Sequence, residues 1–201
     1  MKAKIVILNW NGRAHLQTYL PSVVASCPSW AGVVVADNGS TDDSVEWVSS
    51  TYPNVEIIRL DHNYGFAEGY NRALEQVTDA KYWVLLNSDI ETPQGWLEPL
   101  IECLERNPEV GAVAPKLRAY TDRKRFEYAG ASGGFIDALG YPFCRGRILG
   151  EVECDHGQYD DAREVFWASG AAFCCRAELF HALGGFDDDF FAHMEEIDLC
   201  W

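Results

Sequence analysis

The sequence predicts an α/β fold in which a mostly parallel central sheet is flanked by helices within a single domain. Short apolar runs alternate with segments whose apolar residues recur at helical spacing, a pattern typical of parallel strands joined by right-handed helical crossovers. The 201 residues suffice for one sizeable domain, and the composition, 48% hydrophobic and 23% charged, is that of an ordinary folded protein.

Five apolar runs are the predicted strands of this sheet. The clearest is Tyr82–Leu86, which is apolar throughout, as expected of a strand buried on both faces, and turns polar directly afterwards. The others are 3–8, 32–36, 55–60 and 110–115. Three of the first four strands end in turns rich in Asn and Asp. These turns should gather along one edge of the sheet, where open α/β sheets bind their ligands.

Helical spacing predicts helices at 15–26, 42–50, 92–106, 178–183 and 194–201, and a further helix that follows the stretch 62–71 and runs through about Val77. Ser40 or Thr41 is the expected cap of the second helix, because a hydroxyl can accept a free N–H of the first turn. Thr92-Pro93 is expected to start the fourth helix as a capping residue followed by proline. The last helix has no stop signal, so we expect the natural protein to continue beyond Trp201.

The segment 116–164 has no apolar period and mixes glycines, aromatics and charges. We therefore predict a long irregular excursion over the face of the sheet, which in compact domains is usually functional or mobile. Order is predicted to return within 165–176, as a bend that leads into a strand.

Composition excludes several classes of protein. The formal net charge of −15 argues against a nucleic-acid binder, because the phosphate backbone would be repelled. We expect no secretory signal at the N-terminus, because the apolar run 5–8 is too short for one, and no stretch approaches the ~20 apolar residues that span a bilayer. The seven cysteines form no CxxC pair and lie mostly in apolar segments, which favours free thiols and a cytoplasmic setting. Cys174 and Cys175 should point to opposite faces of one strand.

Two features of the first half allow a structural and a functional interpretation. Asp37 closes a predicted buried strand, and its carboxylate either satisfies N–H groups of the turn or accepts a nucleobase N–H or a ribose hydroxyl. The stretch 63–71 places Gly65 and Gly69 in the loop and first turn at the start of a helix. It is either a loop that needs a positive φ at Gly65 or a backbone that approaches a phosphate at a helix N-terminus.

The polar turn Asn87-Ser88-Asp89 offers a single carboxylate. Asp89 either caps the following segment or holds Mg²⁺ or Mn²⁺ with help from substrate phosphates, as is common for magnesium. Trp10 and Trp167, near predicted strand ends, either belong to the core or stack on a sugar or base.

The acidic cluster Glu195, Glu196 and Asp198 is either a solvated helix face or, in part, a catalytic group. Residues 195 and 198 share a face of a regular helix while 196 points elsewhere, so only part of the cluster can enter one site. A carboxylate in a cleft could act as a general base. His193 precedes the cluster and is either a surface residue or part of that site.

Six stretches, taken in order, resemble family 2 glycosyltransferases with the GT-A fold, a Rossmann-like architecture. Within that family they resemble the bacterial rhamnosyltransferase-like branch that builds surface polysaccharides. The stretches are IVILNWNG (5–12), VVVADNGSTDDS (33–44), NYGFAEGYNRAL (63–74), WVLLNSDIE (83–91), SGAAFCCRAELF (169–180) and GGFDDDFFAHMEEIDLCW (184–201). The resemblance implies a nucleotide-sugar-binding half at 1–115 and an acceptor-side half at 116–201.

The resemblance also assigns roles to single residues. Asp37 would contact the nucleobase of a nucleoside-diphosphate sugar, and Asp89, in the place of the DxD motif, would bind the metal. Glu195-Glu196 matches the family's acidic pair, whose second acid is usually the base, which gives Glu196 with Glu195 as the alternative. The other expected nucleotide-sugar contacts are Asn9, Asn11, Asn38, Gly65, Asn71, Asn87 and Ser88.

The implied reaction is an inverting single displacement, in which the base deprotonates an acceptor hydroxyl that attacks the anomeric carbon. The donor would be a UDP- or dTDP-linked sugar and the acceptor a saccharide or a lipid-linked molecule. A further C-terminal part would supply peripheral membrane contacts at the inner face of the membrane, or contacts within a homo-oligomer. Two departures from the family pattern stand out: Asn87 replaces the first DxD acid, and Glu196 replaces the usual Asp.

Two other functions remain open on the sequence. A non-catalytic nucleotide-sugar-binding module is favoured by Asn87, which lowers the charge available for a metal ion. A sugar nucleotidyltransferase on a related fold is disfavoured, because the N-terminal loop is neither basic nor rich in glycine.

Overall fold

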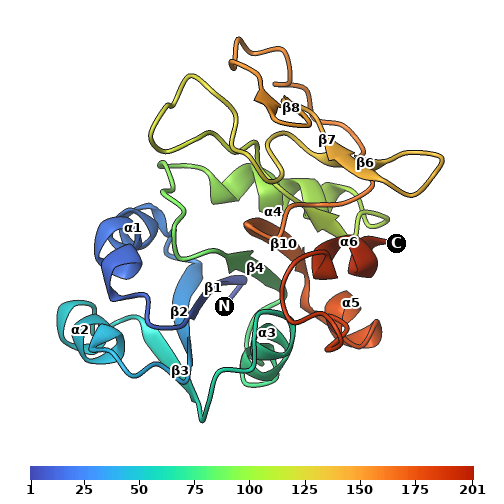
Figure 1. The fold of residues 1–201 in the computed structure, drawn as a ribbon. Coiled ribbons are helices and arrows are strands. Elements are labelled where there is room, and N and C mark those ends of the chain that lie inside the picture. Colours follow the sequence, from blue (N-terminus) through green and yellow to red (C-terminus); the bar gives the residue numbers. More distant parts are fainter.

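The computed structural model describes residues 1–201 and contains a six-stranded mixed sheet with helices on both faces (Figure 1). The strand order is β3-β2-β1-β4-β10-β5. The neighbours β3, β2, β1 and β4 pair in parallel, whereas β10 is antiparallel to both β4 and β5. The bounds are β1 Ala3–Asn9, β2 Ala31–Asn38, β3 Glu56–Leu60, β4 Tyr82–Leu86, β5 Ala112–Val113 and β10 Ala172–Arg176. The predicted α/β class and mostly parallel sheet are confirmed.

The helices divide between the two faces of this sheet. They are α1 Arg13–Ser26, α2 Ser44–Thr51, α3 Ala67–Leu74, α4 Leu97–Arg106, α5 Ala177–Ala182 and α6 Glu195–Cys200. Side chains of α1, α2 and α4 pack into one buried cluster, and those of α3 and α5 into a second cluster on the other face. None of the helices is both long and apolar enough to cross a membrane.

Strand β4 is buried on both faces, as its apolar sequence predicts. Tyr82, Val84 and Leu86 belong to the first cluster, and Trp83 and Leu85 to the second. Each such large apolar side chain contributes about 1.5–3 kcal/mol when it leaves water, which makes β4 the centre of the fold. The predicted opposition of the two cysteines in β10 is also confirmed, because they too fall in different clusters.

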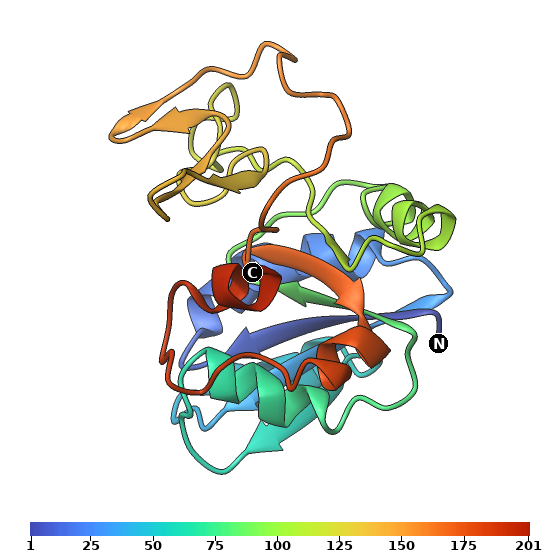
Figure 2. The same ribbon diagram turned by 90° about the vertical axis from the view of Figure 1, so that its right-hand side faces the viewer.

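The segment 116–164 is more ordered than predicted. It contains an antiparallel sheet of four strands, here called the small sheet: β6 Gly134–Ile136, β7 Pro142–Cys144, β8 Arg147–Ile148 and β9 Glu151–Val152. Strands of two or three residues are too short to produce a readable alternation. Gly140 and Gly146 adopt positive φ in its tight turns. The small sheet projects from the main sheet (Figure 2).

Three further sequence predictions are wrong in detail. Helix α4 starts at Leu97, because Thr92 instead anchors its turn on α1, pairing with the hydroxyls of Ser26 and Ser22. Helix α2 starts after Asp43 without a side-chain cap. The hydroxyl of Ser40, an expected cap, instead accepts hydrogen bonds from the side-chain amide of Asn9 at the end of β1 and from the N–H of Asn11. The strand predicted at 110–115 is reduced to the two residues of β5.

Candidate functional site

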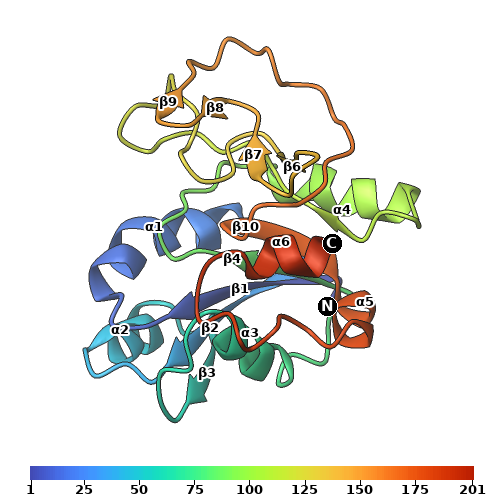
Figure 3. The ribbon, with the colours of Figure 1, turned by 45° about the vertical axis from the view of Figure 1, so that its right-hand side comes forward.

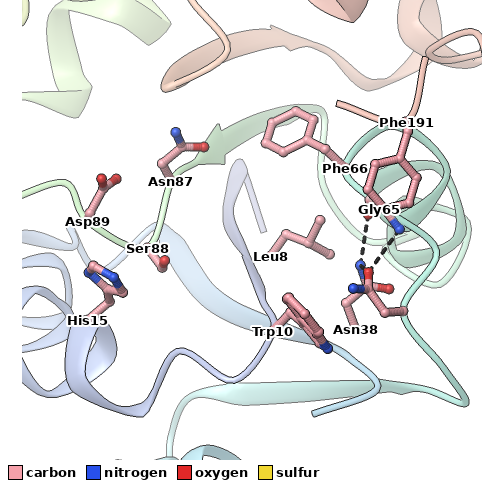
Figure 4. A pocket seen from close by; sticks show the side chains of 11 residues that line it. Leu8, Trp10, His15, Asn38, Gly65, Phe66, Asn87, Ser88, Asp89 and Phe191 are labelled. Carbon is pink, nitrogen blue, oxygen red and sulfur yellow. Dashed lines mark hydrogen bonds between the residues drawn. The ribbon is translucent and has the colours of Figure 1, made fainter. Parts of the chain in front are cut away.

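A pocket of about 490 Å³ opens at the carboxyl ends of the parallel strands (Figure 4). It is bounded by the turns after β1, β2 and β4, the loop before α3 and the segment before α6. The lining residues are Leu8, Trp10, His15, Asn38, Asn63, Gly65, Phe66, Asn87, Ser88, Asp89 and Phe191. The polar turns therefore gather at one edge, as expected, and five of the predicted site residues (38, 65, 87, 88 and 89) lie in one pocket.

Asn38 organises the loop before α3. Its side-chain amide donates to the carbonyl oxygen of Gly65 at 2.8 Å and to the side chain of Asn63 at 3.0 Å. Its own side-chain oxygen accepts the N–H of Tyr64 at 3.0 Å. Gly65 has a φ of +81°, and a Cβ atom there would lie 2.7 Å from Phe191. The loop thus needs glycine for its backbone and for the close approach of Phe191.

Asn9 and Asp37 are buried beside this pocket and are absent from its lining. The Asn9 amide donates to one oxygen of Asp37 at 3.1 Å, and the N–H of Ser40 donates to the other at 3.2 Å. Asn9 also donates to the hydroxyl of Ser44 at 2.9 Å. In this structure Asp37 therefore performs the turn-stabilising role that was one of its two sequence interpretations.

Two other predicted contacts hold loops together outside the pocket. The side-chain oxygen of Asn11 accepts the N–H groups of Thr41 at 2.8 Å and Asp42 at 3.2 Å, which ties the turn after β1 to the turn after β2. The amide of Asn71 donates to the carbonyl oxygen of Phe186 and to Asp188, both at 2.8 Å. Asn71 thus fixes the segment that leads towards α6 and does not line the pocket.

The two candidate stacking tryptophans differ in exposure. Trp10 is 57% exposed and lines the pocket, so its indole is accessible to a ligand. Trp167 is buried, donates its indole N–H to the carbonyl oxygen of Phe135 at 3.0 Å and packs on Gly134. Trp167 is therefore a core residue of the small sheet and not a stacking surface.

The pocket also contains residues that the sequence interpretation missed. His15 comes from the first turn of α1, and Phe191 comes from the segment before α6. Phe66 directly follows Gly65, which was already a candidate site residue, so the sequence could have indicated that Phe66 lines the pocket. Phe191 gives no local signal, because it reaches the pocket only through the packing of a distant segment on Gly65.

The acids of α6 have three different environments. Glu195 is buried, and its Oε2 atom has no hydrogen-bond partner. Glu196 is half-buried, and its carboxyl carbon lies 3.5 Å from the position that a Cβ atom of Gly170 would take. Asp198 is exposed, so it does not share the surroundings of Glu195 as regular helical spacing had suggested. Neither glutamate lines the pocket.

Burial shifts the pKa of both glutamates in the same direction. Loss of solvation raises the pKa of the Glu195 carboxyl, and the neighbouring Glu196 raises it further. Loss of solvation likewise raises the pKa of the Glu196 carboxyl, against the opposing effect of nearby backbone N–H groups. The chain enters α6 through His193 and Met194, whose φ angles are +76° and +75°. His193 is exposed and is absent from the pocket lining.

The pocket offers few ligands for a metal ion. Asp89 is its one carboxylate and His15 its one imidazole, and no group of three or more His, Cys, Asp or Glu side chains is placed to hold a metal. Mg²⁺ and Mn²⁺ commonly bind through one or two carboxylates, with water and substrate phosphates completing the shell. The residues therefore fit an ion shared with a phosphate-bearing ligand, and they do not form a complete cage.

The fold has the GT-A architecture, which solved structures of glycosyltransferases share. The S. aureus TarS fragment 1–349 is similar to this chain in fold, with a TM-score of 0.67 and 16% identity, and the match covers 100% of this chain and 55% of the TarS fragment. GalNAc-T7 with UDP, GalNAc and Mn²⁺ has a TM-score of 0.73 and 16% identity, covering 100% of this chain and 40% of its own. The mannosyltransferase PcManGT of Pyrobaculum calidifontis, with GDP-Man and Mn²⁺, has a TM-score of 0.65 and 18% identity, covering 98% and 50%.

The chain belongs to the Glycosyl transferase family 2, whose model matches residues 4–163. An N-acetylglucosaminyl-diphospho-decaprenol L-rhamnosyltransferase of Mycobacterium tuberculosis is 28% identical over 210 residues, covering 97% of this chain and 68% of the relative. A pre-mycofactocin glycosyltransferase of the same species is 27% identical over 180 residues, covering 84% of this chain and 33% of the relative. The chain thus spans about two thirds of the first relative, and about half or less of the solved structures.

Proposed function

We propose that this chain is the catalytic domain of an inverting glycosyltransferase. It moves a hexose or deoxyhexose from a UDP- or dTDP-linked donor to a saccharide or lipid-linked acceptor during cell-surface polysaccharide synthesis, at the cytoplasmic face of the membrane. The observation that supports this most directly is the pocket that unites Asn38, Gly65 and Asp89 at one edge of the sheet. Similar folds are recorded with UDP, UDP-GlcNAc and GDP-Man, which supports a nucleotide-sugar donor.

The proposed donor site uses the first half of the chain, 1–115. The Trp10 ring is available to stack on the base or ribose, since aromatic faces bind planar or apolar ligand surfaces. Asp37 is proposed to bind the base through its remaining lone pairs, with Asn9 and Asn11 fixing the surrounding turns. Asn38 and Gly65 present loop backbone to the donor, and Asn71 acts by positioning the segment before α6.

The diphosphate is proposed to lie near Asn87, Ser88 and Asp89. A divalent ion, Mg²⁺ or Mn²⁺, would be held by Asp89 together with the diphosphate, and it would neutralise charge that develops on the departing group. The amide of Asn87 and the hydroxyl of Ser88 can hydrogen-bond to phosphate oxygens without adding negative charge. Because Asn87 is neutral, the proposed site is not expected to bind a metal ion strongly when no nucleotide is present.

The proposed base is Glu196, with Glu195 as the alternative. A carboxylate with a raised pKa is a better proton acceptor, and a half-buried position leaves Glu196 more accessible than its neighbour. Glu196 takes the proton of an acceptor hydroxyl as that oxygen bonds to the anomeric carbon. The bond from the anomeric carbon to the diphosphate breaks on the opposite face, which inverts the configuration.

The test is a transfer assay on the chain with a panel of UDP-, dTDP- and GDP-sugars, Mg²⁺ or Mn²⁺, and saccharide or lipid-linked acceptors. Transfer with an inverted anomeric configuration, read by NMR of the product, is the expected result. A folded protein that neither binds nor consumes any donor would overturn the proposal. Binding of a donor without transfer to any acceptor would instead favour a non-catalytic nucleotide-sugar-binding module.

A further inference from the structure

A second cavity, of about 660 Å³, lies on the small sheet and belongs to no part of the donor pocket. Its apolar walls include the stacked rings of Phe135 and Phe143, whose centroids are 5.6 Å apart. Ile148 and Leu149, which also line it, are 71% and 86% exposed. Exposed apolar side chains grouped around a cavity mark a binding surface more often than chance exposure does.

Three arginines line the same cavity, in a chain whose net charge is −15. Arg145 is paired with Asp161 at 2.9 Å. Arg147 donates only to the carbonyl oxygens of Leu149 and Tyr128. Neither Arg147 nor Arg163 has a carboxylate within ion-pairing distance.

The cavity is therefore locally cationic. Its acid, Glu153, accepts the hydroxyl of Tyr159 at 3.1 Å and the amide of Gln158 at 3.2 Å. Two guanidinium groups without a paired carboxylate remain: that of Arg147 lies over the ring of Tyr128, and that of Arg163 lies near the ring of Phe135. A guanidinium presents a planar fork of N–H donors that matches phosphate oxygens.

The cavity is also connected to the helix that carries the proposed base. Cys144 lines the cavity and belongs to a buried cluster with Trp167 and Ile197. Ile197 is the residue next to Glu196, so one cluster supports both the cavity wall and α6. Figure 3 shows the small sheet above β10 and α6 close to that strand.

We propose that this cavity binds the lipid diphosphate of a polyprenyl-diphosphate-linked sugar acceptor. The proposal rests on the proposed function, and it names the acceptor class and its site. Arg147 and Arg163 bind the diphosphate, and the apolar group around Phe143 and Ile148 binds the first isoprene units. The acceptor sugar then extends towards α6. An uncharged saccharide would leave the guanidinium groups without a partner, and free diphosphate would leave the apolar walls uncovered.

The test measures binding of geranylgeranyl diphosphate to the chain by calorimetry, in detergent below the level that forms micelles. We expect the double variant Arg147→Gln/Arg163→Gln to bind it at least tenfold more weakly. Arg106→Gln, which removes an exposed arginine of α4, is the matched control and should bind as the wild type does. The double variant should keep the wild-type melting shift with UDP, because the donor pocket is untouched.

A second variant separates the contribution of the lipid chain to binding from that of the diphosphate. Ile148→Ser/Leu149→Ser changes two exposed side chains, so folding should be preserved. This variant should bind geranylgeranyl diphosphate more weakly than the wild type, but it should bind inorganic diphosphate equally well. Equal binding of the lipid diphosphate by wild type and the arginine variant would overturn the proposal. So would equal affinity for inorganic and geranylgeranyl diphosphate, or binding only to phosphatidylglycerol vesicles. Failure of UDP to bind the wild type would instead count against the donor site alone.

Discussion

The side-chain amide of Asn9 donates to the carboxylate of Asp37 across β1 and β2, at positions that face each other in the parallel register. Both residues are at most 5% exposed. Two strands that the chain separates by a helix are thus joined at the edge where the pocket opens. This pair fixes the ends of β1 and β2 relative to each other at the edge of the sheet where the pocket opens.

Replacing Asp37 should cost stability as well as nucleotide affinity. Asp37→Ala leaves the buried amide of Asn9 and the N–H of Ser40 without this acceptor, and the loss should lower the free energy of unfolding by about 1–3 kcal/mol. Urea denaturation measures it. Glu109→Ala removes an exposed, unpaired carboxylate and should change stability by less than about 0.5 kcal/mol. An Asp37→Ala protein as stable as the Glu109 control would contradict the account of the pair.

Gly65 and Gly95 form a matched pair of positions that separates the cost of backbone strain from the cost of a steric clash. Both have positive φ, +81° and +75°, but a Cβ atom at Gly65 would meet Phe191 at 2.7 Å, whereas nothing lies within 4 Å of one at Gly95. Gly95→Ala should cost about 1–2 kcal/mol from backbone strain alone. Gly65→Ala should cost more and should also reduce the UDP-induced melting shift. Equal costs in the two variants would show that the Phe191 contact is not tight.

The proposed base gives a pH prediction. Glu196 must be deprotonated to accept a proton, and burial raises its pKa above the usual 4.5, so kcat should fall on acidification at a pH above that value. Glu196→Gln should lower kcat by about 10²–10⁴-fold, the usual range for a general base, while donor binding persists. Asp198→Asn, on the exposed side of the same helix, is the control. A larger loss in Glu195→Gln than in Glu196→Gln would transfer the role to Glu195.

Glu195 should make the fold less stable as the pH rises. Its folded pKa lies above the usual 4.5, so the folded state holds the proton more tightly than the unfolded state. Stability from this group is therefore full below about 4.5 and declines as the pH rises through the folded pKa. Glu195→Gln removes the buried charge and should raise the melting temperature at pH 7 but not at pH 4. A variant whose melting temperature parallels the wild type at both pH values would contradict this.

Metal binding should depend on nucleotide. With one carboxylate in the pocket, Mn²⁺ alone should bind weakly, and UDP should tighten it by roughly 5–150-fold, the usual range for coupled sites. Asp89→Asn should abolish the tightening, and Asp122→Asn, an acid outside the pocket, should not. Electron paramagnetic resonance of free Mn²⁺ measures both. Tight Mn²⁺ binding without nucleotide would refute the single-carboxylate site.

The sequence predicted the parallel part of the sheet because each strand there is a continuous apolar run bounded by polar turns. It did not predict that β10 lies between β4 and β5, because strand neighbours depend on pairing between residues far apart in the chain. The small sheet was missed for a different reason. Its strands are too short for alternation to appear, and its order depends on the buried Trp167.

The residues of the candidate site likewise include some that the sequence could predict and some that it could not. Asn38 ends β2, and Gly65 and Asp89 lie in the segments that follow β3 and β4, so their gathering at one edge followed from topology. Phe191 comes from a segment whose path is fixed by tertiary contacts, including the N–H of Phe66 donating to the Phe191 carbonyl oxygen at 2.7 Å. The burial of Asp37 could not be predicted, because a turn carboxylate and a base-binding carboxylate have the same local sequence.

The pairing of β5 with β10 has a consequence for how such a chain can diversify. The whole segment that contains the small sheet leaves the main sheet at Val113 and returns at Ala172, on strands that are direct neighbours. With both ends held together, the entropy cost of a longer or shorter insertion grows only slowly with its length. One such segment could therefore be exchanged for another at these two points without changing residues 1–113. If the proposed function holds, such a chimaera would alter acceptor choice while keeping the donor.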